Sequence, residues 1–385
     1  MEFQELFFNL NNESIEAILT SEHAMDIDLC LDNLFSAVSL IKPVKELGAL
    51  LMKLYSVWGE DSKSRIYATF KQFLFHKPLL LQTENLAPMM IVQYISELID
   101  FEDLLNEFTL ISPTGIDAFV VLANAGEYFK AISKEKYDLL YSTLDPEQKE
   151  YLSVSCDRDY EISNVLMNDD VDKLLELMED PGFNIDGSVP FSPFHVNRLM
   201  CASPRILQAA AFYGAVQCFE LLDVSGARMF AMDRHNNTLV YYAYAGGSMP
   251  IIHRVLHRRP LTLESIGVIH FHRSEIFSMI ADQYTEEELM QGIIHNNLMA
   301  ELRCKSEDAL IYASVYGNWQ VIIASSIAED LQRRVLETAA QYNQWILLEK
   351  VSHLFKAIDP EPLRKIAESY ESNEFLSTLQ FTSSL

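Results

Sequence analysis

Basic residues are scarce in this sequence. Its 385 residues include 29 Lys and Arg against 55 Asp and Glu, so the formal net charge is −26. A protein that binds duplex nucleic acid needs a positive face to displace counterions from the phosphates, so we expect no nucleic-acid partner. The 13 Gly and 13 Pro are few for an all-β chain with many tight turns. Because 49% of the residues are hydrophobic, the composition favours an α-rich chain with a packed core.

Long apolar runs and paired cysteines are also missing. The longest nearly apolar stretches, Leu86–Ile95 and Ile116–Ala125, are about half of the ~20 residues that a membrane-spanning helix needs. Five cysteines stand far apart, at positions 30, 156, 201, 218 and 304, which argues against a disulfide framework or a zinc ribbon. The N-terminal residues lack the pattern of a secretory leader. We therefore expect a cytoplasmic protein without membrane insertion.

Residues 1–152 carry helical periodicity without an obvious repeat, and we expect them to form a helical N-terminal domain. Leu47, Leu50, Leu51 and Leu54 have the spacing that makes one apolar stripe along a helix. A change in composition near residue 153 predicts the domain boundary, and the polar stretch 180–204 predicts a long loop. Two further helices are expected over Met89–Phe101 and Gly115–Ile132.

From residue 203 onward the sequence repeats a local pattern. Gly214, Gly247 and Gly317 each follow an alanine by four residues and precede a pair or run of aliphatic residues. Weaker copies place other residues at the glycine position, namely Asn168-Asp169, Asn296-Asn297 and Asn343, and a last degenerate copy spans 367–379. Repetition at this period predicts stacked helical hairpins.

The physical basis of the pattern is the close approach of helices. An alanine and a glycine four residues apart lie on one face of a helix near its end, so a neighbouring helix can approach closely. Glycine also adopts the positive φ that ends a helix and begins a turn. The aliphatic residues that follow form a stripe that a single hairpin cannot bury, so neighbouring hairpins must stack.

These residues resemble ankyrin repeats. The segment Ala210-Ala211-Phe-Tyr-Gly214, followed by Leu221-Leu222 and Gly226-Ala227, is similar to the family's AAxxG…LLxxGA core. The family's Thr-Pro-Leu-His tetrad is replaced by Arg205-Ile-Leu-Gln208. The resemblance is to a divergent family known mainly from protists, whose members carry a helical N-terminal domain. It implies an all-α fold, with an irregular ankyrin-like α-solenoid over residues 153–385 that has degenerate terminal units.

Two histidines and several basic residues form the one basic segment that we single out. His253 and His257 have the spacing of a metal-binding pair on a helix, but no third ligand follows at a plausible spacing, so a solvated edge beside Arg254, Arg258 and Arg259 is favoured. This edge, with 270–273, could receive an acidic peptide or a phosphate. Internal pairing with nearby glutamates is the favoured alternative.

Tyrosine recurs just before the glycine position or its substitute, at 213, 316, 342 and 370. Such a column is either a set of protein-binding hot spots on an exposed face or inter-repeat packing with satisfied hydroxyls, and packing is favoured. As candidate partner-binding residues we take Tyr213, Arg234, His235, Tyr244 and Tyr316.

The sequence therefore predicts a non-catalytic protein–protein interaction module that uses the concave face and loop tips of the solenoid. No catalytic residue, metal site or cofactor is expected, since no glycine-rich phosphate loop or nucleophile motif occurs. One alternative is a regulatory adaptor, whose N-terminal helical domain docks on a larger complex while the repeats select the client. Another is an enzyme with a site between the two domains.

Overall fold

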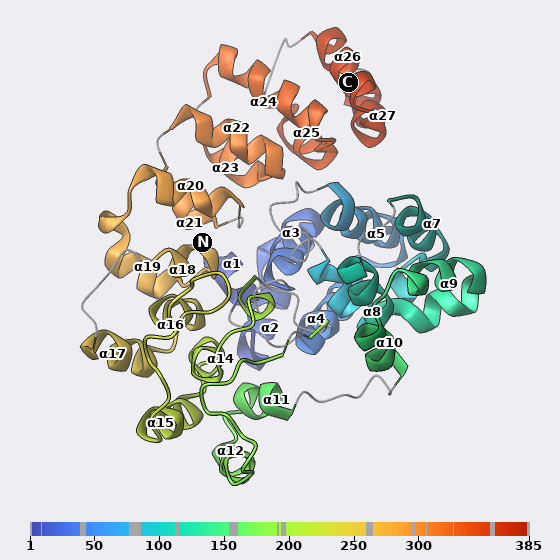
Figure 1. Cartoon of the computed structure of the whole chain (residues 1–385). Coiled ribbons are helices and arrows are strands. Elements are labelled where there is room, and N and C mark those ends of the chain that lie inside the picture. Colours follow the sequence, from blue (N-terminus) through green and yellow to red (C-terminus); the bar gives the residue numbers. More distant parts are fainter. Residues whose placement is uncertain are drawn as a thin grey trace. The chain divides into compact units, whose positions relative to one another are not determined.

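The structure is a computed structural model of the chain (Figure 1). It describes residues 2–8, 10–38, 44–76, 86–111, 115–153, 161–190, 192–193, 198–258, 265–294, 297–304, 306–325, 327–354 and 359–382. These residues form helices, turns and one isolated β-bridge between Ser188 and Arg205, and no strand occurs among them. The all-α prediction is confirmed.

The described residues fall into two compact units. The first unit comprises residues 2–74 and 86–273, and the second comprises 274–382 together with Phe75 and His76. Both the N-terminal helices and the first helical pairs belong to the first unit. That residues 1–152 form a domain of their own, with 153–385 as the other, stays a prediction.

The N-terminal part of the first unit is built of helices that pack around α3, α4 and α8. Its helices are α1 (Glu2–Phe8), α2 (Asn12–Thr20), η1 (Glu22–Met25), α3 (Ile27–Val38), α4 (Val44–Trp58), η2 (Glu60–Ser62), α5 (Lys63–Lys71), η3 (Gln72–His76), η4 (Ala87–Tyr94), η5 (Ser96–Leu98), α7 (Phe101–Ile111), α8 (Gly115–Ile132), α9 (Lys134–Ser142) and α10 (Pro146–Ser153). The predicted leucine stripe lies on α4, and all four of its leucines are fully buried. Helix α8 has the bounds that the sequence predicts.

The helix expected over Met89–Phe101 is not formed. This segment contains the 3-10 helices η4 and η5, and α7 begins at Phe101. Residues 89–92 are all buried, and η4 contacts α3, α4 and α8. Burial on several sides removes the polar face that a surface α-helix presents, and tertiary contacts override helix propensity here.

The rest of the first unit consists of stacked helical pairs (Figure 1). The first helices α11, α14, α16 and α18 contact one another in chain order, and so do the second helices α12, α15 and α17. Their bounds are α11 (Glu161–Met167), α12 (Val171–Met178), α14 (Ile206–Tyr213), α15 (Val216–Val224), α16 (Leu239–Gly246), α17 (Met249–Arg258) and α18 (Ile266–His270). Between α12 and α14 lies the long loop that the sequence predicts, which includes the short helix α13 (Arg198–Cys201).

The second unit has the same arrangement of pairs. The helices α20, α22, α24 and α26 contact in order, as do α21, α23, α25 and α27. Its elements are α19 (Ser274–Ile280), η6 (Ala281–Gln283), α20 (Glu286–Ile294), α21 (Leu298–Glu301), α22 (Glu307–Tyr316), α23 (Trp319–Ala324), α24 (Glu329–Gln341), α25 (Trp345–Val351), α26 (Pro360–Ser369) and α27 (Asn373–Thr382). Stacked helical pairs are thus confirmed within each unit.

A residue with positive φ recurs in the turn after the first helix of a pair. The φ angles are 52° at Asp169, 65° at Gly214, 76° at Gly247, 52° at His272, 72° at Gly317, 53° at Asn343 and 56° at Glu371. The three predicted glycines, Asp169 and Asn343 are confirmed at this position, and Asn296 lies outside the described residues. This left-handed residue ends the helix and turns the chain.

At two of these positions the side chain also links neighbouring pairs. The Asp169 carboxylate accepts hydrogen bonds from the backbone N–H groups of Gln217 (3.1 Å) and Cys218 (2.9 Å), at the start of α15. Asn343 repeats this arrangement in the second unit, where its Oδ1 accepts from the N–H of Phe375 in α27 (3.0 Å). Each side chain satisfies a helix N–H that has no intrahelical partner.

Candidate interaction surface

The loop between α15 and α16, residues 225–238, presents large side chains to solvent. Phe230 is 67% exposed and Met232 is 47% exposed. The predicted contact residues Arg234 and His235 lie on the same loop, and both are exposed. Aromatic residues, methionine and arginine are the types enriched at protein interfaces.

Asp233 holds this loop in one conformation. Its buried carboxylate accepts hydrogen bonds from the N–H groups of His235 and Asn237, both at 2.8 Å. It also accepts from the hydroxyl of Tyr242 (2.6 Å) and from Nδ2 of Asn237 (2.7 Å). Asn236 has a φ of 63°, a left-handed conformation that asparagine tolerates. The loop is therefore fixed by a satisfied carboxylate, and Arg234 and His235 are presented on a rigid turn.

Gln208 on α14 forms hydrogen bonds to the same loop. It is 2% exposed. Its Nε2 donates to the carbonyl oxygens of Ala231 (3.1 Å) and Asn237 (3.0 Å), while its Oε1 accepts from the N–H of Arg205 (2.8 Å). Gln208 thus makes buried hydrogen bonds from α14 to the loop.

A cavity of about 350 Å³ opens beside this loop. Backbone hydrogen bonds tie its walls together, from Val189 N–H to the Pro204 carbonyl (2.7 Å) and from Arg234 N–H to the Ala202 carbonyl (3.3 Å). The lining residues come from three segments of the first unit, namely Ser188, Val189, Pro190, Ser203, Arg205, Met232, Asp233 and Arg234. The residues that line the cavity are therefore two arginines, two serines, three apolar residues and Asp233.

The two arginines of this cavity differ from other arginines of the first unit. Arg65, Arg228, Arg254 and Arg258 each pair with a carboxylate. Arg205 donates from Nη1 to the carbonyl oxygen of Asp186 (3.0 Å), and neither its guanidinium nor that of Arg234 has an ion pair among the described residues. Two arginines that have no carboxylate partner among the described residues therefore line the same cavity.

The three tyrosines predicted as partner contacts are largely covered. Tyr213 is 4% exposed, Tyr244 3% and Tyr316 8%. Burial raises the pKa of Tyr213 and Tyr244, and burial with the nearby Tyr312 and Tyr342 raises the pKa of Tyr316 to about 12. A small share of each ring is open to a partner, and their role as contacts stays a prediction.

The basic segment around α17 is paired internally. Arg254 Nε and Arg258 Nη1 each lie 2.8 Å from the Asp223 carboxylate on α15, and Arg254 Nη1 lies 2.8 Å from Glu220. The expected internal pairing is confirmed for these two arginines. His253 and His257 are exposed, and Arg259 lies outside the described residues. No group of three His, Cys, Asp or Glu side chains within the described ranges is placed to hold a metal ion.

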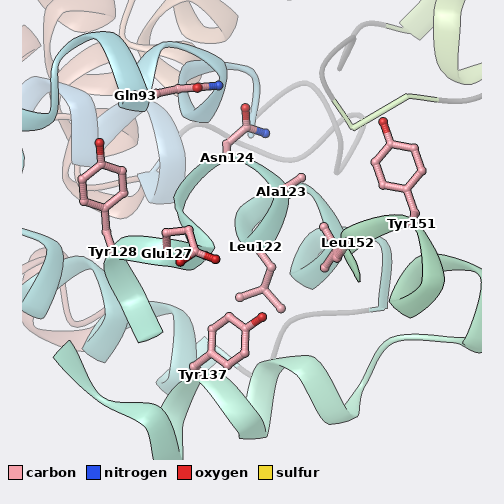
Figure 2. A pocket seen from close by; sticks show the side chains of 10 residues that line it. Gln93, Leu122, Ala123, Asn124, Glu127, Tyr128, Tyr137, Tyr151 and Leu152 are labelled. Carbon is pink, nitrogen blue, oxygen red and sulfur yellow. The ribbon is translucent and has the colours of Figure 1, made fainter. Parts of the chain in front are cut away.

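A second cavity, of about 260 Å³, lies among α8, α9 and α10 (Figure 2). Leu122, Glu127 and the Tyr137 ring approach it from neighbouring helices (Figure 2). Burial, and then the neighbouring Tyr141 and Glu127, raise the pKa of Tyr137. No cysteine, histidine or lysine belongs to the described residues of its wall.

Sequence reasoning singled out Arg234 and His235, whose role as contacts stays a prediction, and did not single out the residues that position them. The signal for Asp233 is its place three and four residues before Asn236 and Asn237, a spacing typical of side-chain-capped turns. The role of Arg205 has no local signal, because the long loop brings it beside Arg234. No helix among the described residues has the length and apolar character needed to cross a bilayer.

No protein-family model matches the sequence, and no curated protein matches it. Among solved structures, the crystal structure of the human ASB11 ankyrin repeat domain is similar over 58% of this chain and 98% of that chain, with 14% sequence identity and a TM-score of 0.27. A similarity at that TM-score carries no argument about this chain. The contacts between successive helices show the stacked pairs. The resemblance to a protist-type ankyrin family stays a prediction.

Proposed function

We propose that this chain is a non-catalytic protein-interaction protein built of divergent ankyrin-like repeats, and that it binds partners with the loop between α15 and α16. The observation that carries the proposal is the exposure of Phe230, Met232 and Arg234 on a loop held by Asp233. Exposed apolar residues beside an arginine that has no ion pair among the described residues are a costly surface for a chain to keep in solvent, and such patches mark interaction sites.

The repeated architecture supports the same function. In a stack of helical pairs each pair contacts its neighbours, so the buried helices hold the shape while the loops vary. Here Gln208 and Asp233 supply the buried hydrogen bonds of the loop. The exposed side chains of the loop do not belong to the buried core. The loop is thus a rigid platform whose outer residues are available for recognition.

Comparative affinity capture with full-length variants tests this function. We expect the variant Phe230→Ser/Met232→Ser/Arg234→Gln to lose a defined set of proteins that the unaltered chain captures in its source cell. The matched control is Leu110→Ser/Leu139→Ser, which removes two exposed leucines from α7 and α9. Circular dichroism verifies that both variants keep their helices. An identical set of captured proteins for the loop variant and the unaltered chain would exclude the loop as the binding surface.

The adaptor alternative is supported by the exposed leucines of α7 and α9, two helices that contact one another. Fragments are unsuitable for testing it, because the N-terminal helices and the pairs up to residue 273 form one compact unit. The leucine variant in the full chain provides the test instead. An adaptor loses one set of partners with the leucine variant and a different set with the loop variant. Loss of a single shared set contradicts two separate surfaces.

A further inference from the structure

We propose that the cavity between Arg205 and Arg234 binds a side-chain carboxylate of an acidic peptide segment in a partner protein, with an apolar residue of that segment against Met232. This inference rests on the proposed function, since it specifies the chemistry that the loop recognises. The residues that line this cavity all belong to the first unit.

Charge selects the ligand class. Arg205 and Arg234 line one cavity, and neither has an ion pair among the described residues, whereas Arg228 on the same loop pairs with Asp186 at 3.1 Å. A guanidinium matches a carboxylate with two parallel hydrogen bonds, and such charge-assisted pairs are stronger than neutral ones. An acidic group is therefore the ligand that both side chains accept best.

The rest of the wall specifies what surrounds that carboxylate. Of the apolar lining residues, Val189 is buried, and Pro190 and Met232 are exposed. Phe230 lies two residues before Met232 on the same exposed loop. An apolar residue of the peptide next to its acidic residue would cover this surface, which water otherwise contacts.

A carboxylate fits better than a phosphate. Sites for phosphorylated peptides gather clusters of arginines around a group of charge near −2. This cavity has two arginines, and its wall also contains the Asp233 carboxylate. The whole chain carries a net charge of −26, so a dianion meets more repulsion than a single carboxylate does.

The cavity is preorganised for this ligand. Asp233 has four hydrogen bonds from the chain itself and is not free to compete for the arginines. Ser203, at the cavity wall, has a φ of 53°, a conformation that costs free energy and persists where the surroundings determine it. Because these contacts already hold the described residues of the cavity wall, binding orders mainly the peptide and the two arginine side chains.

The test is selection of binders from a phage-displayed library of random linear peptides on the immobilised full-length chain. Selected peptides are then synthesised with a fluorescent label, and their affinities are measured by fluorescence anisotropy. Each is compared with a copy in which Asp and Glu are replaced by Asn and Gln. Nonspecific attraction does not favour acidic peptides on a chain of net charge −26, so their binding reports the local site.

We expect the selected peptides to carry Asp or Glu beside an apolar residue, and to lose about tenfold or more in affinity for the Arg234→Gln variant. Arg205→Lys, which keeps the charge but removes the planar fork, weakens the same peptides. Arg333→Gln, which removes an exposed arginine of α24, is the matched control and leaves the affinity unchanged. Amide copies of the peptides bind as weakly to the unaltered chain as the acidic copies bind to Arg234→Gln.

Two results overturn the inference in different ways. Peptides that require Phe230 and Met232 but are insensitive to Arg234→Gln and to loss of their own acids refute the carboxylate site and leave the proposed function standing. A selection without binders, or with binders that no loop variant affects, refutes both. Phosphorylated copies that bind more tightly than the acidic peptides, with the same dependence on Arg234, refute the choice of carboxylate.

Discussion

Replacement of Gly246 by alanine tests the close approach of neighbouring helical pairs. Gly246 is the last residue of α16, and a Cβ atom at this position would lie 2.1 Å from the carbonyl oxygen of Ala211 and 2.8 Å from that of Phe212. Both oxygens belong to the backbone of α14, so no side-chain rotation relieves the contact. Overpacking costs about 1–3 kcal/mol, and alanine recovers about 1 kcal/mol of helix propensity relative to glycine. We expect the upper end of this range and a net loss of about 2 kcal/mol.

The measurement is native-state hydrogen exchange of the amides in α14 and α16, which reports local stability without assuming a single unfolding step. Gly126→Ala is the matched control, because Gly126 lies in the interior of α8 and its Cβ would lie 3.5 Å from Cε2 of Tyr137, an ordinary contact. The control variant gains up to about 1 kcal/mol in α8. If the amides of α14 and α16 were as well protected in Gly246→Ala as in the unaltered chain, the backbones of the two helices would not approach as closely at Gly246 as the Cβ distances indicate.

Three further predictions concern single side chains. Asn343→Gly loses the hydrogen bond to the Phe375 N–H, which lowers the local stability of α27. Asn343→Ala lowers it by about 1 kcal/mol more, because alanine is strained at positive φ. Hydrogen exchange at the start of α27 measures both losses, and equal losses would contradict the left-handed turn. Asp223→Asn removes the charge that two arginines of α17 share, which lowers the free energy of urea unfolding by about 1–3 kcal/mol. The matched control is Asp282→Asn, which has little effect because the Asp282 side chain is fully exposed and its ion pair is screened by solvent. Equal effects would contradict the burial of Asp223. Burial, with Asp169, raises the pKa of the Cys218 thiol from 9.0 to about 12. Because the thiol of the unfolded chain ionises first, the free energy of unfolding is unaffected below pH 9 and falls between pH 9 and 12. Urea midpoints measured across this range test the prediction, and we expect Cys218→Ala to reduce the fall.

The turns between paired helices were predictable because their signal is local. Gly214, Gly247 and Gly317 occupy the left-handed position themselves. Asn343 occupies it as well, because asparagine is one of the few other residues that adopt a positive φ at small cost. The η4 segment was not predictable in the same way. Its apolar residues fit any buried element, and its 3-10 form depends on the helices packed around it.

Exposure of the repeated tyrosines shows a limit of periodicity. Tyr316 and Tyr370 hold the same position in their pairs, yet Tyr316 is 8% exposed and Tyr370 is 56% exposed. Tyr316 belongs to a pair with neighbours on both sides, whereas Tyr370 lies in α26–α27, which has no following pair among the described residues. Tyr342 is 38% exposed although its pair has neighbours on both sides. The sequence repeats the residue, but neither the repeat position nor the place of the pair in the stack alone decides how far the residue is buried.

The candidate surface divides into residues that hold the loop and residues that face solvent, and this division decides which variants are informative about binding. Gln208 and Asp233 are buried and each makes several hydrogen bonds to the loop. Removing either side chain leaves buried polar groups without partners, at about 1–3 kcal/mol for each group, so loss of binding in such a variant would also report loss of the loop conformation. Phe230 and Arg234 are exposed, and neither is part of that hydrogen-bond network. A loss of affinity in a variant of these residues, with the hydrogen exchange of α14 and α16 unchanged, therefore assigns the effect to recognition and not to folding.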